Sequence, residues 1–195
     1  LAHWEGHPLR GALGDILREG NPDAFETARR APECLILRGE LPDPDSLDYL
    51  RDTLGVVAAL LDVGGVAVVD PQILEMFSAA DWRARYAAGE RAAPRNHVLV
   101  LCHDDAGGSA WVKTRGMRKF ARPDVSLRRV PQSEVQRAGA IAARLVELQA
   151  RGMRFGDGST LDVEGTPGGL KITRGGSLDD PEFNNTKLEL EWPHS

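Results

Sequence analysis

The chain has 195 residues, of which 42% are hydrophobic and 27% are charged, and its formal net charge is −5. This composition is ordinary for a globular protein and excludes a disordered chain. The acidic balance disfavours general binding to nucleic-acid phosphates, which needs a basic surface, so a nucleic-acid partner is not expected.

Length and residue usage predict one cytoplasmic globular domain. We expect N-terminal helices over 1–31, a core over 32–151 and C-terminal hairpins over 152–195. No apolar run approaches the roughly 18 residues of a membrane span, and no signal peptide is visible. Arginine far outnumbers lysine, and alanine and glycine are abundant, which suggests a GC-rich bacterial genome. The two cysteines, Cys34 and Cys102, stand in apolar runs and are expected to be buried free thiols.

The N-terminal half predicts mainly helices. Apolar residues recur at helical spacing from Leu9 to Leu17, and Asn21 before Pro22 is typical of an N-cap that begins a second helix. The clearest helix is predicted over 47–61, where the apolar residues form one stripe. Short β-rich runs predict strands at 33–41 and 66–69.

Two further helices are predicted before residue 87. A short one is expected at 73–77. Ser78 and Asp81 have the spacing of a capping box, which predicts another helix through Trp82 and Tyr86.

The middle of the chain predicts a hairpin, a third strand and a long helix. The apolar run at 97–102 is expected to form a central strand, with 110–114 as its hairpin partner and 125–130 as the next strand. Ser133 and Gln136 resemble a second capping box, which would open a helix whose apolar stripe runs from Val135 to Leu148.

The C-terminal part is rich in glycine and predicts a meander of strands at 161–164, 170–174 and 187–192. In the last of these, Leu188, Leu190 and Trp192 alternate with charged residues, as expected for a strand with one buried face. The order of elements predicts an α+β fold with a mostly antiparallel sheet packed against helices and a C-terminal β-hairpin meander.

The common catalytic and cofactor signatures are absent from the sequence. It contains no phosphate-binding loop, dinucleotide fingerprint, His-Glu-x-x-His, Gly-x-Ser-x-Gly or Cys-x-x-Cys motif. We therefore predict no cofactor and no metal, and we favour a non-catalytic protein. Triads and carboxylate pairs assembled in space are not visible in sequence, so an enzyme stays an alternative.

Three groups of polar residues are weighed as sites. His103 and Asp104 follow Cys102 at the end of a predicted strand and are weak catalytic candidates, although strand neighbours point to opposite faces and a plain strand-to-turn junction is the favoured interpretation. His3 and His7 have metal-binding spacing only if that terminus is helical. The oxygen-rich segment 179–185 lacks the spacing of a calcium loop and is interpreted as a turn.

The least generic stretch is 111–124. Gly116 is expected to allow a tight change of direction, with Met117 and Phe120 packing inward from one helical turn. Alternatively, Thr114, Arg115 and Arg122 bind an anion at this turn, and they are the weak binding candidates of the chain.

This stretch resembles a signature of a bacterial family of domains of unknown function. The matching residues are Thr114, Gly116, Met117, Phe120, Pro123 and Asp124, in the pattern Thr-x-Gly-Met-x-x-Phe-Gly-x-Pro-Asp/Glu. Ala121 departs from it, since glycine is expected there. The resemblance extends over roughly 33–150 and implies an α+β fold, but it transfers no catalytic residue.

The leading hypothesis is a bacterial domain that binds a protein or a ligand without catalysis. The alternative is an enzyme with a site assembled near His103, Asp104, Arg115 and Arg122, which requires these side chains to reach a shared substrate. A third possibility, a nucleic-acid binder using the arginines between 115 and 129, is less favoured.

Overall fold

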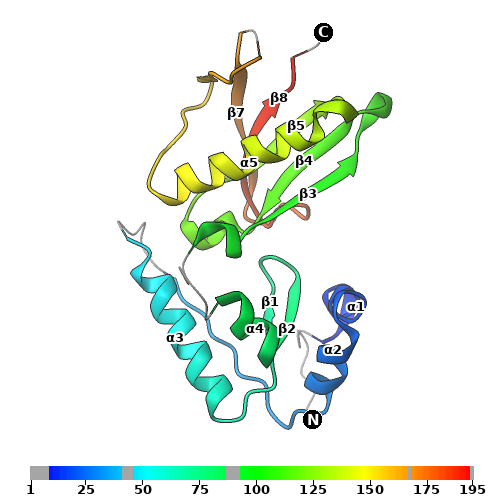
Figure 1. Cartoon of the computed structure of the whole chain (residues 1–195), viewed down its shortest axis with the longest axis vertical. Coiled ribbons are helices and arrows are strands. Elements are labelled where there is room, and N and C mark those ends of the chain that lie inside the picture. Colours follow the sequence, from blue (N-terminus) through cyan, green and yellow to red (C-terminus); the bar gives the residue numbers. More distant parts are fainter. Residues whose placement is uncertain (1–8, 41–45, 87–92, 167, 194–195) are drawn as a thin grey trace. The chain divides into compact units, whose positions relative to one another are not determined.

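A computed structural model of the chain describes residues 9–40, 46–86, 93–166 and 168–193. The chain divides into two compact units, Leu1–Asn96 and His97–Ser195 (Figure 1). The expectation that the whole chain forms one domain stays a prediction. None of the helices in the described ranges combines the length and apolar character needed to cross a membrane.

In its described residues, the first unit combines four α-helices with a β-hairpin. The elements are α1 (Gly11–Gly20), α2 (Pro22–Arg29), α3 (Asp48–Asp62), β1 (Ala67–Asp70), β2 (Glu75–Ser78), α4 (Ala79–Tyr86) and a 3₁₀ turn at Pro94–Asn96. Leu17, Ala24, Phe25 and Met76 form a buried cluster that joins α1 and α2 to the hairpin.

Two predicted helix starts in this unit are confirmed. The Ala24 N–H donates to Asn21 Oδ1 (3.1 Å), so Asn21 is the N-cap of α2. The Asp81 N–H donates to Ser78 Oγ (3.1 Å), as the capping box requires at the start of α4. These polar groups satisfy amide donors that a helix leaves unpaired at its first turn.

Two predictions for this unit are wrong. Residues 73–77, expected as a helix, belong largely to β2, which pairs antiparallel with β1 after a turn in which Leu74 has φ 55°. Residues 33–40 form no strand, and Leu35, Ile36 and Leu37 are exposed. A strand needs a partner for its backbone groups, and within the described ranges this run pairs with none.

The described part of the second unit is a six-stranded sheet with one long helix. Its elements are β3 (Leu99–Asp104), β4 (Ala110–Arg115), β5 (Asp124–Val130), α5 (Val135–Ala150), β6 (Thr160–Leu161), β7 (Leu170–Ser177) and β8 (Asn185–Glu191), with 3₁₀ turns at Ala106–Gly108, Met117–Phe120 and Gln132–Glu134. The strand order is β3-β4-β5-β8-β7-β6, and among the described strands β5 and β8 alone pair in parallel. The expected α+β fold with a mostly antiparallel sheet and a C-terminal hairpin is confirmed.

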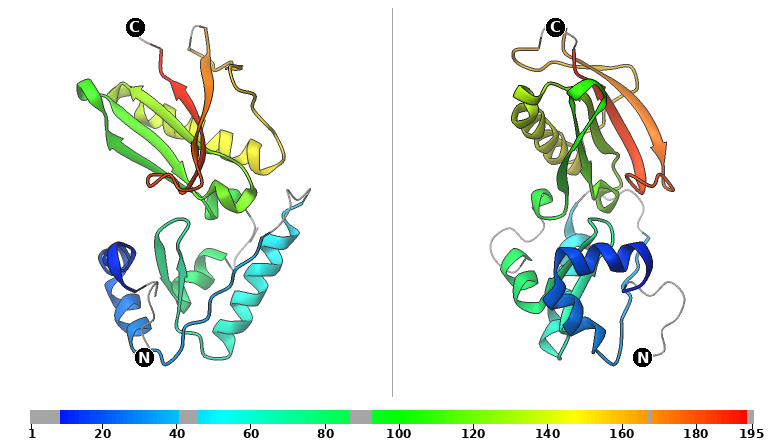
Figure 2. Two further views of the ribbon diagram at one scale, coloured as in Figure 1. Left: turned by 180° about the vertical axis from the view of Figure 1, so that it is seen from behind. Right: turned by 90° about the vertical axis from the view of Figure 1, so that its right-hand side faces the viewer.

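Helix α5 runs along one face of this sheet (Figure 2). The core between them contains Ala138, Ala142 and Leu145 from the helix and apolar residues of β4, β5, β7 and β8. Leu188 and Leu190 are fully buried and Trp192 nearly so, which confirms the alternation predicted for the last strand. The face of the sheet opposite α5 is called the open face below. It carries the side chains that alternate with the core residues, such as Trp111, Lys113 and Arg115 of β4.

Three details of this unit differ from expectation. Strand β3 lies at the edge of the sheet rather than in its centre, so Cys102 is exposed, as is Cys34 in the first unit, and both are free thiols. The Ser133 hydroxyl does not cap α5, whose N-cap is Glu134 after a 3₁₀ turn. The strand expected at 161–164 is shorter and begins one residue earlier, because in the described residues its pairing with β7 is limited to Thr160 and Leu161.

Candidate functional site

The signature residues form a buried joint between β4 and β5. Gly116 has φ 125°, and Met117 and Phe120 in the following 3₁₀ turn are buried, as the sequence predicts. Ala121 has φ 53°, a left-handed conformation in which glycine is favoured. The backbone therefore explains why a glycine suits position 121.

A hydrogen-bond network fixes this joint. Asp124 is fully buried, and its Oδ1 accepts from the Thr114 hydroxyl (2.8 Å) and the Met117 N–H (3.3 Å). Its Oδ2 accepts from Nδ2 of Asn185 (2.9 Å), which also donates to the Arg122 carbonyl (2.8 Å). The network ties β4, β5 and β8 together, which gives the polar residues of the signature a structural role.

Burial raises the pKa of Asp124 to about 6, against the opposing effect of these hydrogen bonds and of the nearby Arg115 guanidinium. Removal from water disfavours the charged carboxylate more than its donors favour it. Ionisation of Asp124 is therefore less favourable in the folded protein than in the unfolded chain.

The three predicted anion ligands are not assembled into one site. Thr114 lies on the helix-covered face with Val112, and its hydroxyl donates a hydrogen bond to Asp124 Oδ1. Arg115, its neighbour on β4, belongs to the open face, and its Nη1 donates to the Glu182 carbonyl (2.8 Å). Arg122 is buried, and its Nη1 donates to the Ala121 carbonyl (3.0 Å).

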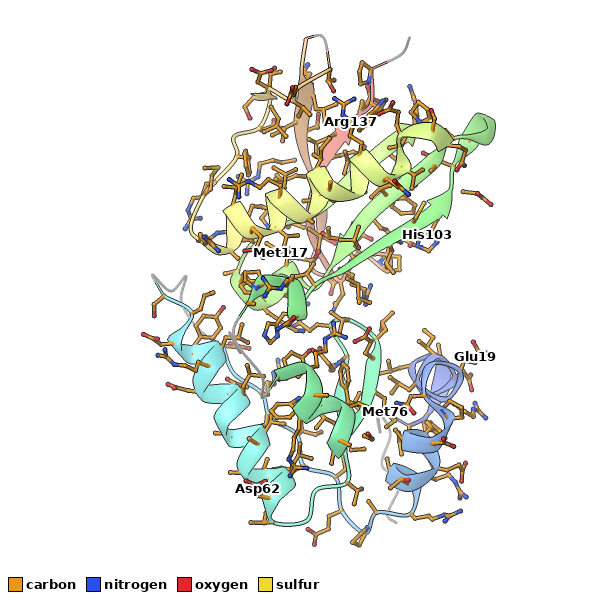
Figure 3. The ribbon with its side chains drawn as sticks, viewed as in Figure 1. Glu19, Asp62, Met76, His103, Met117 and Arg137 are labelled. Atoms are coloured by element: carbon orange, nitrogen blue, oxygen red, sulfur yellow. The ribbon has the colours of Figure 1, made fainter. Side chains whose placement is uncertain are left out.

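The catalytic candidates are likewise spread along the β3–β4 hairpin. His103 pairs with Trp111, whereas Arg115 pairs with Leu99 at the other end of the ladder. Four residues of strand separate these positions, about 13 Å. Figure 3 labels His103 on β3 and Met117 in the turn that follows the far end of β4. His103 and Asp104 are exposed, and the geometry does not bring them to Arg115 and Arg122.

The open face instead carries a cluster of rings and cations, the Trp111 cluster, which consists of Trp111, Lys113, Arg128, Phe183 and His103. The Arg128 guanidinium carbon lies 3.7 Å from the centre of the Trp111 ring, and Lys113 Nζ lies 4.1 Å from it. Phe183 meets Trp111 edge to face at 5.9 Å, and the His103 ring lies at 6.0 Å. The Trp111 indole N–H donates to Ser126 Oγ (2.9 Å), which fixes the ring on the sheet.

Two loops supply carboxylates to the edge of the cluster. Asp105, after β3, accepts from the N–H groups of Ala106 and Arg129 and from Arg128 Nη1 (3.3 Å), and the bonds to Ala106 and Arg129 lower its pKa most. Glu182, before β8, forms an ion pair with Lys113, and this contact lowers the pKa of Glu182. Each loop therefore places a carboxylate next to a cation of the sheet, Asp105 next to Arg128 and Glu182 next to Lys113.

The segment 179–185 is a turn, as predicted. The Asp180 carbonyl accepts from the Phe183 N–H (3.3 Å), and Asp180 Oδ1 accepts from the Glu182 N–H (2.9 Å). Across the described residues, no group of three or more potential metal ligands gathers, and His3 and His7 lie outside those residues.

The Trp111 cluster was not identified from sequence. One signal was available: Trp111, Lys113 and Arg115 alternate along a predicted strand and must share a face. The contributions of Arg128, from the next strand, and of Phe183 and Glu182, about seventy residues away, depend on the sheet order and have no local sequence signal.

In comparisons with known proteins, the chain matches no family model, and neither a curated protein nor a solved structure is significantly similar to it. The resemblance to a bacterial family of unknown function therefore stays a prediction.

Proposed function

We propose that this chain is a non-catalytic, cytoplasmic bacterial binding domain that takes an extended acidic segment of a partner protein along β3. The observation that carries the proposal is that β3 is an edge strand of six residues beside the Trp111 cluster. Within the described ranges, no strand pairs with its outer edge.

The edge of β3 carries little of the usual protection, since Asp104 at its end is its one acidic or basic side chain apart from His103. Natural sheets shield edge strands with lysine, proline, bulges or covering segments, because unpaired backbone groups recruit other strands. β3 contains neither lysine nor proline, and Val100 is 44% exposed. An added strand would satisfy these backbone groups, and neighbouring side chains would supply specificity.

The charges next to β3 favour an acidic segment. Lys113 of β4 and Arg128 of β5 lie over the Trp111 ring on the open face, and the His103 ring of β3 lies beside it. A polyphosphate backbone is disfavoured, since Glu189 and Glu191 lie on the same face in register with Ser126 and Arg128 and the net charge is −5. A protein segment with a few acidic side chains suits this mixed surface.

The test uses a displayed library of random peptides about eight residues long, the length of an ordinary strand. We expect selection of acidic, β-prone sequences that slow amide hydrogen exchange in β3. Val100→Lys, which adds the protection that edge strands normally carry, should weaken binding at least tenfold.

The matched control is Val63→Lys, at an exposed valine of the first unit, which should leave the affinity unchanged. Equal binding to Val100→Lys, or protection of amides outside β3, would refute this mode of binding.

A further inference from the structure

We infer that Lys113 and Arg115 form a carboxylate-binding site that Glu182 occupies in the free protein and that an acidic side chain of the bound segment takes over. This inference rests on the proposed function and names the group that the open face recognises.

Two cations are buried side by side on β4. Lys113 is 3% exposed and Arg115 is 8% exposed, and as alternate residues of one strand they share the open face. Burying a charge is costly unless hydrogen bonds and an opposite charge compensate it. The site therefore has a strong electrostatic demand for an anion.

The protein meets this demand only in part. Arg115 donates to the backbone carbonyl of Glu182, and its Nε is buried without a hydrogen-bond partner among the described residues. Burial lowers the pKa of Arg115 even though the carboxylates of Asp124 and Glu182 act in the opposite direction, as expected for a guanidinium with incomplete compensation. One donor of the pair is thus left for a further acceptor.

Glu182 is suited to exchange with an outside carboxylate. Its carboxylate contacts Lys113, yet its side chain is 56% exposed and stands in the turn between β7 and β8. The exposed Glu182 carboxylate can return to water when it leaves, and an incoming carboxylate that takes over its contact keeps the buried Lys113 charge paired. The backbone carbonyl that holds Arg115 stays in place when the side chain leaves.

The chemistry of the site favours a monoanionic carboxylate. The present occupant is itself a carboxylate, and Asp180 acts on it with like charge, which would oppose a dianion. Phe183 and Trp111 flank Lys113 Nζ at 5.6 Å and 4.1 Å and offer apolar surface to the stem of the incoming side chain. Glutamate combines such a stem with a carboxylate, so we assign the site to a glutamate side chain of the partner.

The experiment is chemical rescue of Glu182→Ala. This variant removes the internal carboxylate, keeps the carbonyl that holds Arg115 and leaves Lys113 unpaired, so its melting temperature should fall. Added acetate, compared with chloride at equal ionic strength, should restore the melting temperature in this variant and not in the wild type. Glu189→Ala, on the same face beside Lys187 (3.4 Å), is the matched control and should show no acetate effect.

Each outcome decides the inference. Acetate stabilising all three proteins equally, or none, would overturn it, and a larger effect of inorganic phosphate would reassign the site to phosphate. Rescue should disappear in the double variant Glu182→Ala, Lys113→Met, whose apolar replacement keeps the stem of the lysine. Since the rescue needs no peptide, it can succeed or fail independently of peptide binding at β3.

Discussion

At the scale of single residues, the turn between β4 and β5 places a non-glycine residue in a left-handed backbone conformation that disfavours a Cβ atom. Ala121 follows the 3₁₀ turn with φ 53° and is exposed. A Cβ in this left-handed region costs about 1–2 kcal/mol, and glycine avoids that cost while losing some chain entropy on folding.

We therefore predict that Ala121→Gly stabilises the protein by about 0.5–1 kcal/mol, measured as a rise in the urea midpoint at constant m. The control is Ala143→Gly, at an exposed position in α5, which should destabilise by about 1 kcal/mol. If both substitutions destabilise equally, position 121 does not adopt the left-handed conformation.

A second prediction at this scale concerns Asp124. Burial in the folded state raises the pKa of its carboxyl from the ordinary value of 3.8 to about 6, so the folded protein binds this proton more tightly than the unfolded chain does. Stability from this group is then full below about pH 4 and is lost as the pH rises through about 6, by roughly 3 kcal/mol.

Asp124→Asn, which cannot titrate, should remove this dependence. The free energy of unfolding of the wild type relative to the variant should fall between pH 4 and pH 7, as urea titrations at several pH values can measure. Other carboxyls titrate in both proteins and cancel in the difference. A difference that is flat or rises with pH would contradict the burial cost assigned to Asp124, and Asp104→Asn, at an exposed position, is the control.

At the scale of elements, the helices were predictable because their signals are local. A stripe of apolar residues and a cap define α3 and α2 from consecutive residues, and the structure places them where these signals stand. The run at 73–77 was wrongly predicted as a helix, because β2 is formed by pairing with β1 and its own periodicity does not indicate a strand.

Strand positions were less predictable than strand existence. The apolar run ending in Cys102 has the composition of a central strand, yet it occupies an edge because the last two long strands add to the other side of β5. The run at 33–40 has strand propensity and remains unpaired among the described residues. Propensity describes how a residue fits a sheet, while the order of strands depends on contacts distant in sequence.

The candidate site combines both cases. The signature from Thr114 to Asp124 was visible in sequence and proves to be a structural joint. The Trp111 cluster was not recognised, because Glu182 and Phe183 reach β4 only after β8 has paired beside β5. The motif therefore marks residues that hold the fold together, whereas the Trp111 cluster depends on the order of the strands in the sheet.

At the scale of the whole chain, the two units have separate cores. Leu17, Phe25 and Met76 pack in the first unit, and the sheet residues pack on α5 in the second. Separate cores commonly open separately, since the stability of each unit is set by its own contacts. This arrangement allows a matched pair of substitutions, because Ile73 and Ile172 are both fully buried, one in each unit.

We predict that Ile73→Val and Ile172→Val each weaken one unit alone. Deleting one buried methyl group costs about 0.5–1.5 kcal/mol, small enough for both variants to fold. Native-state hydrogen exchange should show reduced protection within 9–96 for Ile73→Val and within 97–193 for Ile172→Val. If either variant lowers the protection of both units by the same amount, the chain unfolds as one cooperative domain, as its length and composition predict, and the binding surface around β3 then depends on the core of the first unit.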